Sequence, residues 1–293
     1  MTKAALEHYH ARMQRVLDHI DRHPDGDLGL DALSAVAAFS KHHFHRQFKA
    51  IFGLSVHRYV HLVRMKRASH RLAFRSGARV TDVALDAGYE APEAFARAFR
   101  QSFGQLPSDF RKSPAWEPWL AALGPLTDAR SRFMNSPYSA EDVRIVSVPA
   151  TPVAIMEHRG DPNRLGDTIR RFIQWRKANG VRPATSATFT VFHVDPEKSA
   201  PEDYHIDLCA GTDRTFPAGD GVLAGLIPAG RCAVIRVIGS SDDLRPVAQF
   251  LYGRWLPASG EEARDFPLYA ERVRFFPDVP EHEAVTDLFL PLR

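Results

Sequence analysis

Apolar residues recur at helical spacing in the stretch SKHHFHRQFKAIFG, residues 40–53. They stand at i, i+4, i+7 and i+8, namely Phe44, Phe48, Ile51 and Phe52, as in a helix with one buried face. Basic and histidine side chains occupy the opposite face. We therefore predict an amphipathic helix that turns a narrow basic stripe toward solvent.

The same pattern returns 51 residues later, in APEAFARAFRQSFG, residues 91–104. The aromatic rings, the central arginine and the closing glycine coincide in the pairs Phe44/Phe95, Arg46/Arg97, Phe48/Phe99, Phe52/Phe103 and Gly53/Gly104. Repetition at this period indicates one small structural unit used twice.

Each unit, at about 28–53 and 79–104, is typical of a short helix, a tight turn and a longer helix with a polar outer stripe. This is the helix-turn-helix plan, whose second helix enters the major groove of DNA. Residues 56–74 join the units without proline or glycine. At ~1.5 Å per residue they predict a rod of roughly 28 Å, which suits two recognition helices about one DNA turn, ~34 Å, apart.

The charge distribution agrees with a nucleic-acid partner for the first part of the chain. Residues 1–113 hold 18 Lys and Arg against 11 Asp and Glu, whereas residues 114–293 hold 20 against 24. A basic half joined to an acidic half indicates that only the first half meets a polyanion, although random variation in surface charge stays open on this ground alone.

Residues 9–112 resemble the DNA-binding domain of the bacterial AraC/XylS-family transcription regulators. The resemblance rests on the duplicated unit, the Arg-x-Phe-(Lys/Arg) core of both second helices and the pattern DAGYEAPEAFARAFRQSFGQLPSDFR. One departure is Val56, where the family usually has proline; its copy, Pro107, is kept. The resemblance implies double-stranded DNA as a partner, with base-reading side chains at His42, His45, Arg46, Glu93 and Arg97.

Three further basic residues suit phosphate contacts, which fix register without reading sequence: Lys41, Lys49 and Arg100. A metal site at His42 and His45 and a merely solvated basic face are the alternatives to groove reading. A structural zinc site has four ligands, which usually include cysteine, and residues 1–113 contain no cysteine. We therefore predict no metal and no cofactor.

Proline-rich residues 113–142 predict a linker between residues 1–112 and a second domain at 143–293. From Val143 the apolar period changes to two, which indicates strands, with helical patterns at 165–179 and 243–255. The order strand, helix, strand, strand occurs twice, about 79 residues apart. The fold class predicted for the chain is an all-α tandem helix-turn-helix domain followed by an α+β domain of duplicated modules.

This second half resembles the GyrI-like effector-binding domain, whose two halves form a groove. The likeness is carried by the closing strands and the segment PAGRCAVIRVIGSSDDL. It implies a small-molecule effector. Related domains often carry a glutamate in an aromatic-lined pocket, which here matches Glu271.

In LYAERVRFF, strand alternation places Glu271 on one face with Tyr269, Val273 and Phe275. A buried carboxylate must pair or take up a proton, and a lipophilic cation with nearby aromatic rings suits such a partner. A structural ion pair with a local arginine and a simply exposed face are the alternatives. The residues proposed for the effector pocket are Glu271, Tyr269, Tyr204, Trp175, Phe192 and Trp255.

His205, Asp207 and Cys209 share one face of YHIDLCAG, but neighbours on one strand point in parallel rather than converging as a nucleophilic site requires. We predict no catalytic residues and no enzymatic activity. Two cysteines, no apolar membrane span and no signal peptide suggest a cytoplasmic protein.

The expected function is a DNA-binding transcription regulator whose second domain senses a small molecule and which can contact RNA polymerase. The alternatives are a GyrI-like hydrolase fused to a DNA-binding domain and a ligand-independent activator.

Overall fold

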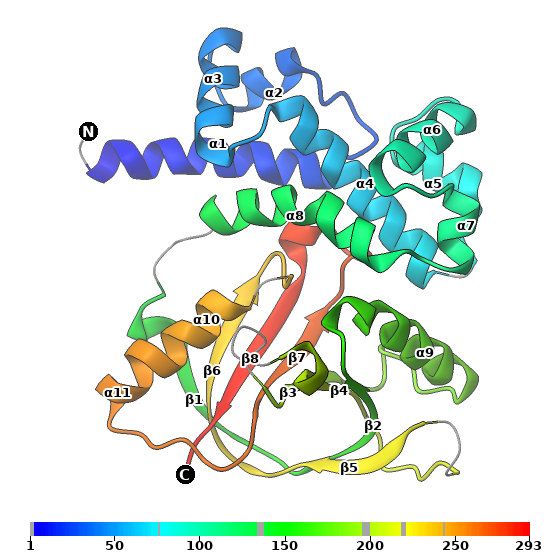
Figure 1. The fold of residues 1–293 in the computed structure, drawn as a ribbon. Helices are drawn as coiled ribbons and strands as arrows, with labels where there is room; N and C mark the ends of the chain where they lie inside the picture. The colour runs from blue at the N-terminus through cyan, green and yellow to red at the C-terminus, as the bar shows by residue number, and fades with distance from the viewer. Residues whose placement is uncertain (1–2, 76, 134–137, 195–199, 218–220, 243) are drawn as a thin grey trace. The chain divides into compact units, whose positions relative to one another are not determined.

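The computed structural model describes residues 3–75, 77–133, 138–194, 200–217, 221–242 and 244–293. The chain forms two compact units, Met1–Ser136 and Pro137–Arg293. The first is helical and the second combines an antiparallel sheet with helices (Figure 1). The predicted fold class is confirmed.

The helices of the first unit are α1 (Lys3–Arg22), α2 (Leu30–Val36), α3 (Lys41–Phe52), α4 (Val56–Phe74), α5 (Val80–Asp86), α6 (Pro92–Phe103), α7 (Pro107–Lys112) and α8 (Trp116–Phe133). The pairs α2–α3 and α5–α6 are the two helix-turn-helix units, and α4 is the rod between them (Figure 1). The rod occupies the residues that the sequence predicts.

The phenylalanines of α3 and α6 form matching parts of one core. Phe48 lies 5.4 Å from Tyr59 of α4, ring centroid to centroid, at an interplanar angle of 81°. Its copy Phe99 lies 5.3 Å from Phe110 of α7 at 73°. The 51-residue repeat is therefore a repeat of packing as well as of sequence.

Gly53 and Gly104 end the two recognition helices in the left-handed region, with φ of 71° and 73°. The backbone N–H of each bonds to the carbonyl oxygen four residues before it, Lys49 or Arg100. Glycine adopts this conformation without the steric cost that a Cβ atom brings, which explains its presence at both helix ends.

Helix α8 lies within the segment 113–142 that the prolines indicate as a linker. Trp116, Leu126 and Ala129 are buried in the core of the first unit. Trp119 donates its indole N–H to Ser69 Oγ of α4 at 2.8 Å. The apolar spacing of these residues supplies a buried helical stripe, and Pro125 is accommodated inside the helix.

The second unit contains β1 (Val143–Val148), β2 (Thr151–Arg159), β3 (Thr188–Phe192), β4 (His205–Gly211), β5 (Leu223–Ile227), β6 (Gly230–Ile238), β7 (Leu268–Arg274) and β8 (Val285–Pro291). They form one antiparallel sheet in the order β1-β6-β8-β7-β3-β4-β2-β5 (Figure 1). Its helices are α9 (Leu165–Ala178), α10 (Arg245–Phe250), a π-helical turn (Leu251–Trp255) and α11 (Leu256–Ser259).

Two modules, β2-α9-β3-β4 and β6-α10-β7-β8, have the same element order, as the sequence predicts. They meet where β3 pairs with β7 at the centre of the sheet. Each module also receives an edge strand from the other half, because β1 pairs with β6 and β5 pairs with β2. The sheet therefore joins the duplicated halves into one body.

The two faces of this sheet have different surroundings. One face packs against α9 and α10 through two separate apolar clusters. The other carries a third cluster, in which Tyr269 stacks on Phe289 at 4.7 Å with an interplanar angle of 4°.

Among the described residues of the chain, no helix has both the length and the apolar character needed to cross a membrane.

Candidate functional site

The first candidate site is the outer surface of α3 and α6. Every fourth residue of each helix is a buried phenylalanine, and the face opposite these rings is turned toward solvent. On α3 the predicted DNA contacts Lys41, His42, Arg46 and Lys49 are exposed and His45 is half-buried. On α6 the corresponding residues Glu93, Arg97 and Arg100 are exposed. Both helices thus present their predicted contact residues to solvent.

One of these residues already has a partner within the protein. Lys41 Nζ lies 2.5 Å from Asp31 Oδ1 of α2, and both side chains are more than half exposed. Such an exposed pair contributes roughly 0–1 kcal/mol. A DNA phosphate can therefore compete for Lys41 at small cost.

Arg64 of α4 holds the loop before α2 close to the turn between α5 and α6. Its Nε donates to the carbonyl oxygen of Pro24 at 2.6 Å, and Nη2 donates to that of Gly26 at 3.1 Å. A Cβ atom at Gly88, where φ is +74°, would lie 2.8 Å from Arg64 Nη2. This guanidinium thus links the two helix-turn-helix units through the rod.

The second candidate site surrounds Glu271 on β7. Glu271 is half-buried, and its partners in the strand register are Phe189 on β3 and Asp287 on β8. Arg236 of β6 donates from Nε and Nη2 to the two Asp287 oxygens at 2.7 and 2.6 Å. The arginine beside Glu271 is therefore hydrogen-bonded to another carboxylate.

Burial raises the pKa of the Glu271 carboxyl, and the neighbouring Asp287 carboxylate raises this pKa further. Arg236 acts in the opposite direction by favouring the ionised form. The site is a carboxyl group in a partly dry, partly negative environment, which a cation would stabilise.

Tyr269 lies on the same face of β7 as Glu271 but is a core residue. The residue is 2% exposed, and its ring stacks on Phe289 and contacts Phe189 and Phe266. Its hydroxyl lies 3.6 Å from Cys232 Sγ, and burial raises its pKa. These neighbours enclose the ring that the sequence assigns to an effector pocket.

The other four predicted pocket residues belong to the opposite, helix-covered face. Trp175 and Tyr204 pack in the α9 cluster, Trp255 packs in the α10 cluster, and Phe192 contacts both. On β3, Phe189 and Val191 join the cluster of Tyr269, so the alternation of the strand turns Phe192 away from them. The structure does not bring these four residues together with Glu271.

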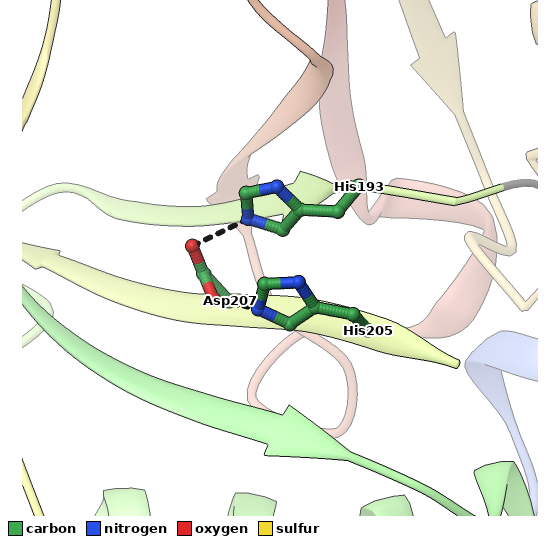
Figure 2. Close-up of side chains that lie close together, drawn as sticks. All are labelled: His193, His205 and Asp207. Carbon is green, nitrogen blue, oxygen red and sulfur yellow. Dashed lines mark hydrogen bonds and ion pairs between the residues drawn. The ribbon is translucent and has the colours of Figure 1, made fainter. Parts of the chain in front are cut away.

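Two histidines and one aspartate form a cluster on the sheet face that the helices do not cover. The sequence does not predict a binding site at this place. His193 Nε2 lies 2.7 Å from Asp207 Oδ2, and His205 Nε2 lies 3.1 Å from Asp207 Oδ1 (Figure 2). The two imidazole rings stack, with centroids 3.9 Å apart and planes 5° apart. The sequence shows His205 and Asp207 on one strand face, but His193 joins them only through strand pairing.

Cys209, which follows on the same face of β4, is 1% exposed. Burial raises its pKa far above the ordinary thiol value. The protonated, enclosed thiol is a poor nucleophile, which supports the view that His205, Asp207 and Cys209 are not a nucleophilic triad.

Comparison with known proteins agrees with both units. Residues 141–293 match the family described as GyrI-like small molecule binding domain, and residues 33–113 match a helix-turn-helix domain. The chain is a helix-turn-helix transcription regulator of the AraC type with a small-molecule-binding domain. It belongs to the GyrI-like family, whose match covers more than half of its length.

Three bacterial relatives illustrate these matches. "Probable transcriptional regulator YgiV" of Escherichia coli K12 is 37% identical over 153 residues, 52% of this chain and 96% of that protein. "Transcriptional regulator Rob" of Salmonella typhimurium is 34% identical over 147 residues, 48% of this chain and 49% of that protein. "Regulatory protein SoxS" of the same organism is 31% identical over 100 residues, 34% of this chain and 92% of that protein.

Proposed function

We propose that α3 and α6 read two successive segments of the major groove and that a cationic ligand near Glu271 modulates this regulator. The observation that carries the DNA part is the pair of matching helices, each with buried phenylalanines behind and exposed polar side chains in front. Base edges would be contacted by His42, His45, Arg46, Glu93 and Arg97, and phosphates by Lys41, Lys49 and Arg100.

Selection of DNA by the 293-residue chain from a random library, followed by footprinting, tests this arrangement. We expect two protected half-sites about 10 base pairs apart, because one turn of DNA separates major-groove segments on the same face. A single protected half-site, or protection without sequence preference, would show that the two helices do not read DNA together.

The effector part of the proposal rests on the Glu271 carboxyl. Its pKa is raised, and the guanidinium of Arg236 is hydrogen-bonded to Asp287. A lipophilic cation would offset the lost hydration of the Glu271 carboxylate, and the ring of Phe189 could add a cation–π contact. Of the six pocket residues expected from sequence, this proposal retains Glu271 as the binding group.

Calorimetry with a lipophilic quaternary ammonium ion and its neutral carbon analogue tests the effector site. We expect the cation to bind more tightly, and Glu271→Gln to remove this preference while leaving DNA affinity in the absence of ligand unchanged. Glu262→Gln, at an exposed residue paired with Arg293, is the matched control and should bind both molecules as the wild type does. Equal affinities of the wild type for both molecules would exclude a cation site at Glu271.

We propose that the second unit binds its ligand without transforming it and that the DNA-bound protein contacts RNA polymerase. The relatives are named as regulators rather than enzymes, which supports this assignment. Mass spectrometry of the ligand after incubation with the protein tests it, since a reaction product would favour the hydrolase alternative. Transcription from a promoter that carries the selected site, with purified RNA polymerase, tests the contact.

A further inference from the structure

The two modules of the sheet differ in how they stabilise an equivalent buried aspartate. Asp207 on β4 and Asp287 on β8 are 7% and 6% exposed. In the strand register, Asp287 faces Arg236, whereas Asp207 faces Glu157. The second module therefore supplies a cation where the first supplies another carboxylate.

Histidines occupy the space around Asp207. His193 and His205 take the positions that Val273 and Val285 hold in the second module, 80 residues further along. Their Nε2 atoms lie 2.7 and 3.1 Å from the two Asp207 oxygens, and His205 Nε2 also lies 3.5 Å from Glu157 Oε1. The first module thus replaces an arginine and two valines with a carboxylate and two imidazoles.

We propose that His193, His205 and Asp207 form a binding site for a divalent transition-metal ion of the zinc class, with Glu157 beside it as a further ligand. The ligand atoms of the first three residues all lie within 4.8 Å of one another. A tetrahedral zinc ion has bonds of about 2.0–2.1 Å to imidazole nitrogen and carboxylate oxygen, so its ligand atoms are about 3.3 Å apart. Small side-chain movements, including a tilt of the stacked rings, bring the cluster to that spacing.

The types of ligand select the class of metal. Imidazole nitrogen suits zinc, copper, nickel, cobalt and iron, whereas magnesium and calcium prefer oxygen ligands. Two imidazoles and one carboxylate form a common protein ligand set for catalytic or exchangeable zinc, and they leave a position for Glu157 or a small ligand.

The burial and the charges of these side chains also favour a bound cation. Asp207 and His205 side chains are 9% and 13% exposed, whereas His193 is 30% exposed and gives solvent access to the cluster. Arg159 pairs with Glu157 through Nη2 at 3.0 Å, but its side chain is 61% exposed. A metal ion would give Asp207 the close positive partner that Arg236 gives Asp287.

The proposal departs from the sequence-based expectation of no metal anywhere in the chain, because pairing of β3 with β4 is what brings His193 to Asp207. The test is calorimetric titration of the 293-residue chain with Zn²⁺ and with Co²⁺. The protein is first treated with a chelator and desalted. We expect one equivalent of each ion to bind, and the Co²⁺ complex to show the visible absorption of a low-symmetry nitrogen and oxygen site. Magnesium should not compete.

Two variants and one control locate the binding. Asp207→Asn and His193→Gln should each weaken Zn²⁺ binding by at least about tenfold, since loss of even a residue that only supports a metal ligand has an effect of this size. The double variant His42→Ala/His45→Ala removes two histidines of α3 and should still bind one equivalent of Zn²⁺. Because Asp207→Asn alters a buried group, circular dichroism should establish its fold, whereas His193→Gln changes a more exposed residue.

A Zn²⁺-dependent rise in the melting temperature of the wild type, lost in His193→Gln, would independently support the site. Unchanged affinity in the folded Asp207 and His193 variants would overturn the proposal. Loss of Zn²⁺ binding in the α3 double variant would also overturn the proposal, because the metal would then be bound by the histidines of the helix-turn-helix unit.

Discussion

Glu271 and Asp287 lie directly opposite each other on neighbouring strands, β7 and β8. Arg236 of β6 donates two hydrogen bonds to the Asp287 carboxylate. Glu271 remains beside a negative charge in a partly buried position, which raises its pKa. The relationship places an acid that resists ionisation at the centre of the small-molecule-binding domain.

Glu271→Gln should therefore raise the melting temperature at pH 7–8. A carboxyl whose pKa is raised by folding contributes stability below its unfolded pKa, and this contribution is lost as pH rises through the folded pKa. Glutamine cannot ionise, so its advantage over the wild type should shrink as the pH falls to about 4, near the unfolded pKa. Thermal melts across this range measure the difference, and a variant less stable than the wild type at pH 8 would contradict it.

Arg46→Ala and Arg97→Ala should each weaken binding to the selected DNA site by about 1–3 kcal/mol and relax the preference at one base position. The reason is that an arginine can form two hydrogen bonds to the edge of a guanine. Fluorescence anisotropy with the selected site and with single-base variants measures both effects.

Lys49→Ala is the matched control on the same helix. It should weaken binding to specific and random DNA alike and reduce the dependence of affinity on salt, because a phosphate contact releases counterions. Equal losses on specific and random DNA for Arg46→Ala would exclude that residue from base reading.

Leu126→Ala should destabilise the first unit by about 2–5 kcal/mol, because it removes a buried side chain and leaves a cavity. Leu120→Ala makes the same change on the same helix at a residue that is 43% exposed, compared with 1% for Leu126. Its effect should stay within about 0.5 kcal/mol. Urea unfolding followed by circular dichroism compares the two, and equal effects would show that α8 does not belong to the core.

Gly104→Ala should destabilise the protein by roughly 1–2 kcal/mol, because alanine pays a steric penalty at a φ of +73°. Gly253→Ala should stabilise it by about 0.5–1 kcal/mol, because alanine reduces the conformational freedom of the unfolded chain. Gly253 is an exposed residue of the helical turn Leu251–Trp255, and an added Cβ atom would meet no other part of the structure within 4 Å. The melting temperatures of the two variants should therefore shift in opposite directions. A higher melting temperature for Gly104→Ala would contradict the left-handed conformation at this helix end.

The residues that the sequence identifies most clearly are those with a strong local period. Phe44, Phe48 and their copies predict both recognition helices, because burial on a helix depends on spacing along the chain. The prolines of α8 make its sequence resemble a linker, and only its packing in the first unit shows that its apolar residues are buried. Composition alone predicts a linker there.

In the second unit, alternation predicts the strands but not which strands become neighbours. Phe192 and Glu271 therefore come from correctly predicted strands and still belong to opposite faces of the sheet. His193 and Asp207 are close for the same reason, because β3 pairs with β4. Which strands become neighbours depends on contacts between residues distant in sequence, and the alternation within one strand does not encode these contacts.

The sequence by itself determined the two kinds of domain, the duplicated helix-turn-helix units and the duplicated order of strands and helices. Helical period, strand alternation and internal repetition are local properties of the chain, so they are visible without a structure. Only the tertiary structure decided the partners of Glu271 and the cluster at Asp207. Both depend on pairing between strands, which sets the charges and the burial that each side chain experiences.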